Sequence, residues 1–427
     1  MANLEENPKT DSGSLAGTPP RNRPDTQSIR SLPHPGGGKV FSDTYDRAAS
    51  QRVMIVAGEA SGDIYGADLV SEALNLEPQL QFFGIGGARM REAGVETLVD
   101  SADMAVVGLV EVLKHFDVIS AAFLKLKNIL LNDPPSLLIL IDYPGFNLRL
   151  AKVAKKAGVK VLYYISPQIW AWRQGRVKKI AALVNHMAVI LPFEAPFYER
   201  AGVPVTFVGH PMLDLVKVTV GRNQAAVEFG LDPARKIVGL FPGSRKNEIE
   251  RLLPVIIGAA KLLKERFSDI QFILPLASTL QEDDIAPQLK AAGLNVIMTR
   301  QRIHEMIRAC DAVISVSGTV TLEIALVGTP MVIIYKLSPL TYQLAKRLVK
   351  IKDIGLCNIV AGETVVKELI QNQANPDQIA AEITKILTDT LYTAQIKERL
   401  ATIRTKLGGG GASKNVARLT FKLMGLQ

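Results

Sequence analysis

Short apolar runs that alternate with helical segments constrain the fold of this chain more than any other feature. The runs are rich in Leu and β-branched residues, which is typical of strands buried on both faces of a parallel sheet. A first set comprises Val53–Val56, Phe82–Ile85, Leu137–Asp142, Val159–Ile165, Met187–Leu191 and Thr206–Val208, and a second comprises Ile237–Phe241, Phe272–Pro275, Asn295–Met298, Ala312–Ser315 and Val332–Tyr335. The alternation predicts an α/β fold of two Rossmann-like domains with parallel sheets facing a central cleft.

The length of 427 residues also favours two domains, because a single core of that size is uncommon. Residues 1–50 are rich in Pro, Gly, Ser and charge, which predicts a disordered tail. We expect a first Rossmann-like domain over 51–213 and a second over 214–400. Residues 401–427 contain a glycine-rich break followed by a C-terminal helix.

The composition restricts the class of partner and the compartment. The net charge of +9 favours acidic partners, but no nucleic-acid-binding module is present, so we expect no nucleic acid partner. The two cysteines, Cys310 and Cys357, indicate a reducing compartment. Basic and apolar residues mix in Tyr342–Lys352, which fits an anionic membrane surface and an ordinary amphipathic helix equally well. No apolar run is long enough for a membrane span.

Two polar segments follow strands of the first set, where open α/β sheets bind their ligands. Ile141–Asn147 places the carboxylate of Asp142 at a strand end, and the next such segment contains Trp170, Trp172 and Arg173. A buried carboxylate suits general base catalysis. The alternatives are a turn-forming Asp and a pair of tryptophans that only anchor packing.

In the second half, a turn with Gly243, Ser244 and Arg245 lies between a strand and a helix. It combines a glycine that permits close approach of the backbone, N–H donors near a helix start and a guanidinium. These groups suit a diphosphate. An ordinary turn with a surface arginine is the alternative.

A second turn of this kind contains Ser317, Gly318 and Thr319 and opens the helix Val320–Val327. Glu323 lies one helical turn further on, where its carboxylate can accept hydrogen bonds from the two hydroxyls of a ribose. The alternative is an acidic residue that only stabilises the helix dipole.

Six collinear motifs resemble those of the lipid-A-disaccharide synthases, which are glycosyltransferases of the two-Rossmann, GT-B type. The motifs are Ala57–Asp63, Ile141–Asn147, Trp170–Arg173, Phe241–Arg245, Ser317–Thr319 with Glu323, and Asn358–Gly362. The resemblance runs from about Val53 to the C-terminus. The chain departs from the family pattern at Gly145, where relatives have Asp, and at Cys357.

The resemblance implies an inverting transfer from UDP-2,3-diacylglucosamine to 2,3-diacylglucosamine 1-phosphate (lipid X), giving lipid A disaccharide 1-phosphate and UDP. It makes Asp142 the general base and Arg245 the group that stabilises the leaving diphosphate. The UDP-sugar would contact Gly243, Ser244, Arg245, Ser317, Gly318, Thr319, Glu323 and Asn358. The acceptor side would contain Glu59, Ser61, Trp170, Trp172 and Arg173. We treat His210 as a positioning or structural residue.

We expect no cofactor and no metal, and a UDP-sugar and an acylated glucosamine phosphate as ligands. The oligomeric state is open, with a homodimer as one option. The protein would be cytoplasmic and peripherally associated with the inner face of the inner membrane. The apolar stretch Met104–Val110 would face acyl chains or form a buried helix. The alternatives are a peptidoglycan GlcNAc transferase with an undecaprenyl-linked acceptor, a UDP-GlcNAc 2-epimerase and a non-enzymatic scaffold at the membrane.

Overall fold

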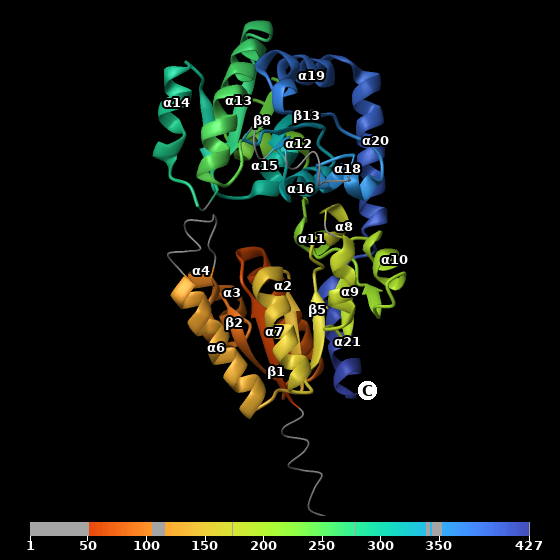
Figure 1. Cartoon of the computed structure of the whole chain (residues 1–427). Coiled ribbons are helices and arrows are strands. Elements are labelled where there is room, and N and C mark those ends of the chain that lie inside the picture. The colour runs from red at the N-terminus through yellow and green to blue at the C-terminus, as the bar shows by residue number, and fades with distance from the viewer. Residues whose placement is uncertain are drawn as a thin grey trace, which may run out of the picture. The chain divides into compact units, whose positions relative to one another are not determined.

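The computed structural model describes residues 51–104, 116–172, 174–277, 279–338, 342–343 and 352–426 (Figure 1). All of these belong to one compact unit, residues 45–427. The predicted tail over 1–50, the stretch from 105 to Val110, Arg173 and most of Tyr342–Lys352 lie outside the described residues. No helix within the described ranges is both long and apolar enough to cross a membrane.

The first sheet has seven parallel strands in the order β3-β2-β1-β4-β5-β6-β7. The strands are β1 (Arg52–Ala57), β2 (Gln81–Gly86), β3 (Glu96–Asp100), β4 (Leu137–Ile141), β5 (Lys160–Tyr164), β6 (His186–Val189) and β7 (Val205–Phe207). The order reverses between β1 and β4, which pair so that Ala57 lies opposite Ile141. Ligands of open α/β sheets bind at the carboxyl ends of strands at such a reversal.

Successive residues of the central strands enter different cores, because side chains alternate across a sheet. Met54 and Val56 pack in a core with residues of α6 (Phe116–Asn132) and α7 (Pro144–Lys156). Val53 and Ile55 face the opposite side, where the core contains residues of α2 (Ala60–Leu76) and α21 (Ala412–Met424). Shorter helices complete this half: α3 (Ala88–Glu92), α4 (Ser101–Met104), α8 (Ile169–Trp172), α9 (Val177–Ala181) and α10 (Glu194–Glu199).

The second sheet has six parallel strands in the order β10-β9-β8-β11-β12-β13. They are β8 (Ile237–Phe241), β9 (Gln271–Pro275), β10 (Val296–Thr299), β11 (Ala312–Val316), β12 (Met331–Tyr335) and β13 (Glu368–Ile370). Its helices are α12 (Arg222–Glu228), α13 (Lys246–Arg266), α14 (Ala286–Ala291), α15 (Ile303–Ala309), α16 (Val320–Val327), α18 (Leu356–Ala361), α19 (Pro376–Thr388) and α20 (Thr390–Lys406). The order reverses between β8 and β11, so the turns after these two strands meet at one edge.

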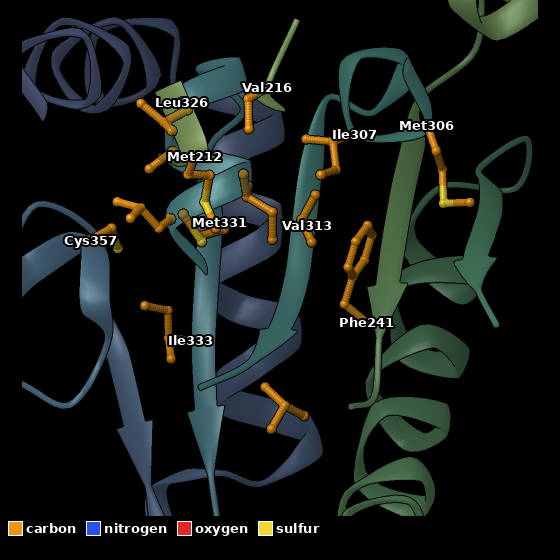
Figure 2. Close-up of a cluster of buried hydrophobic side chains, with 14 of the residues drawn as sticks. Met212, Val216, Phe241, Met306, Ile307, Val313, Leu326, Met331, Ile333 and Cys357 are labelled. Carbon is orange, nitrogen blue, oxygen red and sulfur yellow. The ribbon is translucent and has the colours of Figure 1, made fainter. Parts of the chain in front are cut away.

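The connection after the first sheet enters the core of the second. Met212 and Val216, at either end of α11 (Met212–Leu215), lie in a buried cluster with Leu326 and Met331 (Figure 2). The chain later returns, because the C-terminal helix α21 contacts α2, β4 and β5 (Figure 1). The C-terminal helix therefore packs on the first sheet.

The structure confirms the α/β class and two parallel sheets with helices. The sequence analysis left out two edge strands, β3 and β13. The side chains of β3 are only partly buried, and β13 has three residues, so neither has the continuous apolar run that marks a central strand.

Candidate functional site

The turn after β4 holds Asp142 in an unusual backbone conformation. Asp142 and Tyr143 have φ values of 43° and 45°, and Ile165 at the end of the neighbouring strand β5 has a φ of 65°. Left-handed backbone is uncommon for residues other than glycine and is strained for a β-branched residue. Each such residue costs about 1–3 kcal/mol, and strained residues cluster at functional sites.

Buried and partly buried hydrogen bonds hold this turn in place. Asn147 on α7 donates its amide hydrogens to the carbonyl oxygens of Ile141 (3.1 Å) and Asp142 (2.8 Å). The Tyr163 hydroxyl donates to the same Asp142 carbonyl at 2.6 Å. The Asp142 backbone N–H continues the sheet by donating to the Tyr164 carbonyl at 3.1 Å. The main chain of Asp142 is therefore held in place by groups other than its own carboxylate.

The turn after β1 packs against this strand end. A Cβ atom on Gly58 would lie 2.6 Å from Cδ1 of the Tyr143 ring, so only glycine fits there. The next residue, Glu59, is the exposed N-cap residue of α2, and its side chain makes no capping hydrogen bond. Because β1 and β4 are neighbours, Glu59 and Asp142 come from adjacent strand ends.

The surroundings of Asp142 favour its protonated form. Burial and the negative charge of Glu59 raise the pKa of Asp142 to about 6. A hydrogen bond from the Tyr143 backbone N–H lowers this pKa but does not offset the other two effects. A carboxylate with a pKa near 6 is still mostly ionised at neutral pH and is a stronger base than an ordinary Asp. The site thus gives Asp142 the acid–base properties that proton abstraction requires.

A cavity of ≈ 330 Å³ has Asp142 in its wall. The polar residues of the wall are Ser61, Asp142, Ser166, Gln168, Arg176, Glu194, His210 and Thr319. Apolar side chains complete it, among them Leu148, Ile169 and Leu356. An apolar wall with a few placed polar groups is typical of a small-molecule site.

Glu194 is a residue of this wall that the sequence analysis did not single out. Its side chain is 1% exposed, and burial raises its pKa to about 7. Its carboxylate accepts hydrogen bonds from the Trp170 indole N–H and the Leu191 backbone N–H, both at 3.1 Å. The available signal was position, because Glu194 begins the helix α10 that comes after the buried strand β6.

Trp170 is outside the cavity wall but contacts one of its residues, Glu194. Its ring is buried, packs edge-on against Phe193 with centroids 4.8 Å apart, and donates to Glu194. Gln168 and Ile169 of the same segment are in the cavity wall, whereas Trp170 is not. The packing interpretation of this tryptophan therefore describes its contacts better than an open ligand platform. Trp172 ends helix α8.

His210 is held neutral in the wall of the same cavity. Burial lowers the pKa of His210 to about 4, and its Nδ1 accepts a hydrogen bond from the Met212 backbone N–H at 3.2 Å. Its own backbone N–H donates to the Leu407 carbonyl at 3.1 Å. These contacts fit the structural or positioning role that we expected rather than that of a base.

In the second half, the turn before α13 already binds a carboxylate. Gly243 has a φ of 108°, and a Cβ atom there would lie 2.4 Å from Glu248 Oε2. That oxygen accepts hydrogen bonds from the backbone N–H groups of Ser244 (3.1 Å) and Arg245 (3.3 Å). The Arg245 guanidinium pairs with Glu248 Oε1 at 3.0 Å, although 62% of its side chain is exposed. The donors predicted for a diphosphate thus converge, and here they hold Glu248.

The second turn lies at the end of the adjacent strand β11. The Ser317 hydroxyl donates to the Ile354 carbonyl at 3.0 Å, while Gly318 and Thr319 are exposed. Glu323 on α16 makes a hydrogen bond with His304 on α15, with 3.0 Å between Oε2 and Nε2. The structure therefore brings the two turns to one edge of the sheet and adds His304, which the sequence analysis missed.

Asn358 is fully buried and its amide is fully used. The side chain donates to the Val366 carbonyl and to Glu368, each at 2.8 Å, and accepts from the Val365 and Val366 backbone N–H groups. Glu368 in turn accepts from the Gly355 N–H at 2.9 Å. Asn358 thus fastens α18 to the segment that follows it and to β13, so any effect of this residue on a ligand passes through these contacts.

Asp63, in the first turn of α2, has a structural role. Its carboxylate accepts hydrogen bonds from the backbone N–H groups of Gly87 (2.6 Å), Arg89 (3.1 Å) and Met90 (3.1 Å) at the start of α3. Ser61, two residues earlier, is exposed and lines the cavity. Gly145, where the family pattern has Asp, faces open space, so the difference has no consequence for packing.

The fold and the strand-end sites define a two-Rossmann α/β protein, and solved structures share this fold. An S. aureus MnaA structure with UDP is 14% identical with a TM-score of 0.62, covering 88% of this chain and 98% of that one. UDP-GlcNAc 2-epimerase from Neisseria meningitidis, bound to UDP-GlcNAc, is 16% identical with a TM-score of 0.60 over 87% of this chain and all of that one (100%). At these identities the likeness concerns the fold alone.

The sequence itself gives the family. The lipid-A-disaccharide synthetase family model matches residues 53–417. Lipid-A-disaccharide synthase of Trichlorobacter lovleyi is 72% identical over 374 residues, covering 88% of this chain and 98% of that protein. The enzyme of Geobacter sulfurreducens is 63% identical over 378 residues, with the same coverage of 88% and 98%. The chain belongs to the lipid-A-disaccharide synthetase family.

Proposed function

We propose that this protein joins UDP-2,3-diacylglucosamine to 2,3-diacylglucosamine 1-phosphate and releases UDP, as expected of a lipid-A-disaccharide synthase. The observation that carries the proposal is a partly buried, strained strand-end carboxylate, Asp142, in the wall of a cavity in a chain of this family. The epimerase alternative rests on the fold alone, because the epimerase structures are only 13–16% identical to this chain.

In the proposed reaction, Asp142 accepts the proton of the acceptor 6-hydroxyl. The hydroxyl oxygen attacks the anomeric carbon of the donor as the bond from that carbon to the UDP oxygen breaks, which inverts the configuration. The electron pair of the broken bond stays on UDP, and the proton stays on Asp142 until solvent removes it. Glu59 contributes by raising the pKa of Asp142 towards neutrality.

Negative charge grows on the diphosphate as it leaves. We assign the stabilisation of this charge to the Arg245 guanidinium and the backbone N–H groups of Ser244 and Arg245. These donors already bind the two oxygens of one carboxylate, that of Glu248. Preorganised donors aimed at developing charge are a large source of rate enhancement. The diphosphate would replace the Glu248 carboxylate. The turn Ser317–Thr319 supplies further contacts to the UDP-sugar, and Glu323 accepts the ribose hydroxyls.

On the acceptor side, the proposal uses the cavity with Asp142 in its wall. Ser61 and Gln168 offer hydrogen bonds to sugar hydroxyls, and Arg176 places a guanidinium at the wall that suits the 1-phosphate. Trp170 donates a hydrogen bond to Glu194, which is itself a residue of this wall. Trp172 and Arg173 remain acceptor-side predictions, because their side chains are outside the part of the chain that the structure describes.

We further propose peripheral contact with an anionic membrane on the cytoplasmic side. Both substrates carry acyl chains, and helix α6 exposes Val118, Leu124 and Leu131 beside Lys125 and Lys127. Apolar and basic side chains on one helix suit a membrane interface. Co-sedimentation with vesicles containing anionic lipid, at low and high salt, tests this proposal. The wild type is compared with the double variant Leu124→Ser/Leu131→Ser.

The deciding experiment incubates the purified protein with both acylated substrates and measures products by mass spectrometry. Formation of the disaccharide phosphate together with UDP supports the proposal. Asp142→Asn, which keeps the shape of the side chain, should lower turnover by about two to four orders of magnitude. Conversion of UDP-GlcNAc to UDP-ManNAc without disaccharide would instead support an epimerase.

A further inference from the structure

His304 and Glu323 form a side-chain pair on two neighbouring helices of the second half. Nε2 of His304 lies 3.0 Å from Oε2 of Glu323, and the two side chains are 19% and 21% exposed. The helices α15 and α16 that carry them contact each other. The pair is therefore partly sheltered but still reachable from solvent.

The pair uses only one oxygen of the carboxylate. Among the described residues, Glu323 has no hydrogen-bond partner other than His304, so Oε1 accepts none. Both residues line a cavity of ≈ 740 Å³ together with Thr319, which opens α16. One oxygen of Glu323 is thus anchored and the other can accept a hydrogen bond from a ligand.

We infer that His304 is a positioning residue that fixes the Glu323 carboxylate for recognition of the ribose diol of the nucleotide. The inference rests on the proposed function, which gives Glu323 that diol. A glutamate has three rotatable side-chain bonds and loses much freedom when a ligand orders it. A histidine that already holds one oxygen removes part of this loss before the ligand binds. Either the neutral Nε2–H tautomer or the imidazolium can donate this hydrogen bond.

The alternative is that the pair only fastens α15 to α16. A fastening role predicts that loss of His304 affects every nucleotide equally. The positioning role predicts an effect only on nucleotides that carry the two hydroxyls. A comparison of UDP with 2′,3′-dideoxy-UDP separates the two roles, because the second compound keeps the base and the diphosphate.

The experiment measures the dissociation constants of both nucleotides by calorimetry for the wild type, His304→Phe, His304→Gln and Glu323→Gln. The wild type should bind UDP about 10- to 100-fold more tightly than the dideoxy compound, since hydrogen bonds to a charged group are lost. His304→Phe should weaken UDP by a few-fold to about tenfold and leave the dideoxy compound unchanged. His304→Gln keeps an N–H donor and should restore most of the affinity.

Glu305→Gln is the matched control, because Glu305 lies next to His304 on the same helix but pairs with Arg302. It should change neither dissociation constant. An equal loss for both nucleotides in His304→Phe, or unchanged discrimination, overturns the inference while the ribose assignment of Glu323 stands. Equal affinity of the wild type for both nucleotides overturns the ribose assignment itself and the inference with it. If His304→Phe does not fold, His304→Asn, which is too short to reach Glu323, replaces it with the same expectations.

Discussion

The pH dependence of the reaction tests the assignment of Asp142 as general base. Burial and Glu59 raise the pKa of Asp142 from 3.8 to about 6. With a pKa of about 6, roughly one tenth of the free enzyme has an ionised Asp142 at pH 5 and roughly nine tenths at pH 7. Because the ionised form is the base, kcat/KM should rise about tenfold between these pH values and then level off.

A variant at Glu59 isolates the cause of the shift. Glu59→Gln removes the negative charge that raises the pKa of Asp142, so the acidic limb of kcat/KM should move to lower pH. The acceptor phosphate also titrates near pH 6, but the same acceptor is used in every assay. A shift of the acidic limb between variants is therefore caused by a group of the protein. Initial rates of disaccharide formation from pH 4.5 to 8.5 at subsaturating acceptor provide the measurement.

Glu72→Gln is the control, since Glu72 is on the same helix α2 but does not contribute to the pKa of Asp142. Its pH profile should superimpose on that of the wild type. A wild-type profile that is flat between pH 5 and 7 would refute a base with a pKa near 6. An acidic limb that stays in place in Glu59→Gln would refute the role of Glu59.

Three further predictions concern stability and binding. Glu194 has a folded pKa of about 7 against 4.5 unfolded, so its contribution to stability is present below pH 4.5 and is lost as the pH rises through 7. Between pH 5 and 9 the free energy of unfolding, measured in urea, should fall by about 3 kcal/mol more in the wild type than in Glu194→Gln. The same dependence of this free energy on pH in both proteins would contradict the prediction. Asp63→Ala leaves three backbone N–H groups without their acceptor and should lower the free energy of unfolding by about 3 kcal/mol, whereas a loss under about 1 kcal/mol would argue against this cap. Arg245→Ala should weaken UDP binding and turnover together, with only partial rescue by Lys because the bidentate fork is lost; unchanged UDP affinity would place the diphosphate elsewhere.

The sequence alone was sufficient for the fold class and for the positions of the main site loops. Continuous apolar runs mark the central strands because both faces of a parallel sheet are buried. Asp142 follows one such run directly, and Gly243 lies two residues after another. Since ligands of these sheets bind at the carboxyl ends of strands, position in the sequence already indicated position in the site. The same local logic predicted the helix Val320–Val327 with the bounds that the structure has.

Only the tertiary structure decided what each side chain does there. Trp170 and Asn358 belong to motifs that suggested ligand contacts, yet both are buried and bound to other residues. Glu194 and His304 gave no motif, because their partners are 24 and 19 residues away in the sequence. The pKa of Asp142 likewise depends on burial and on Glu59 from a different strand end. Burial, pairing and charge are set by contacts between distant segments, and for this physical reason local sequence patterns located the site but did not assign its parts.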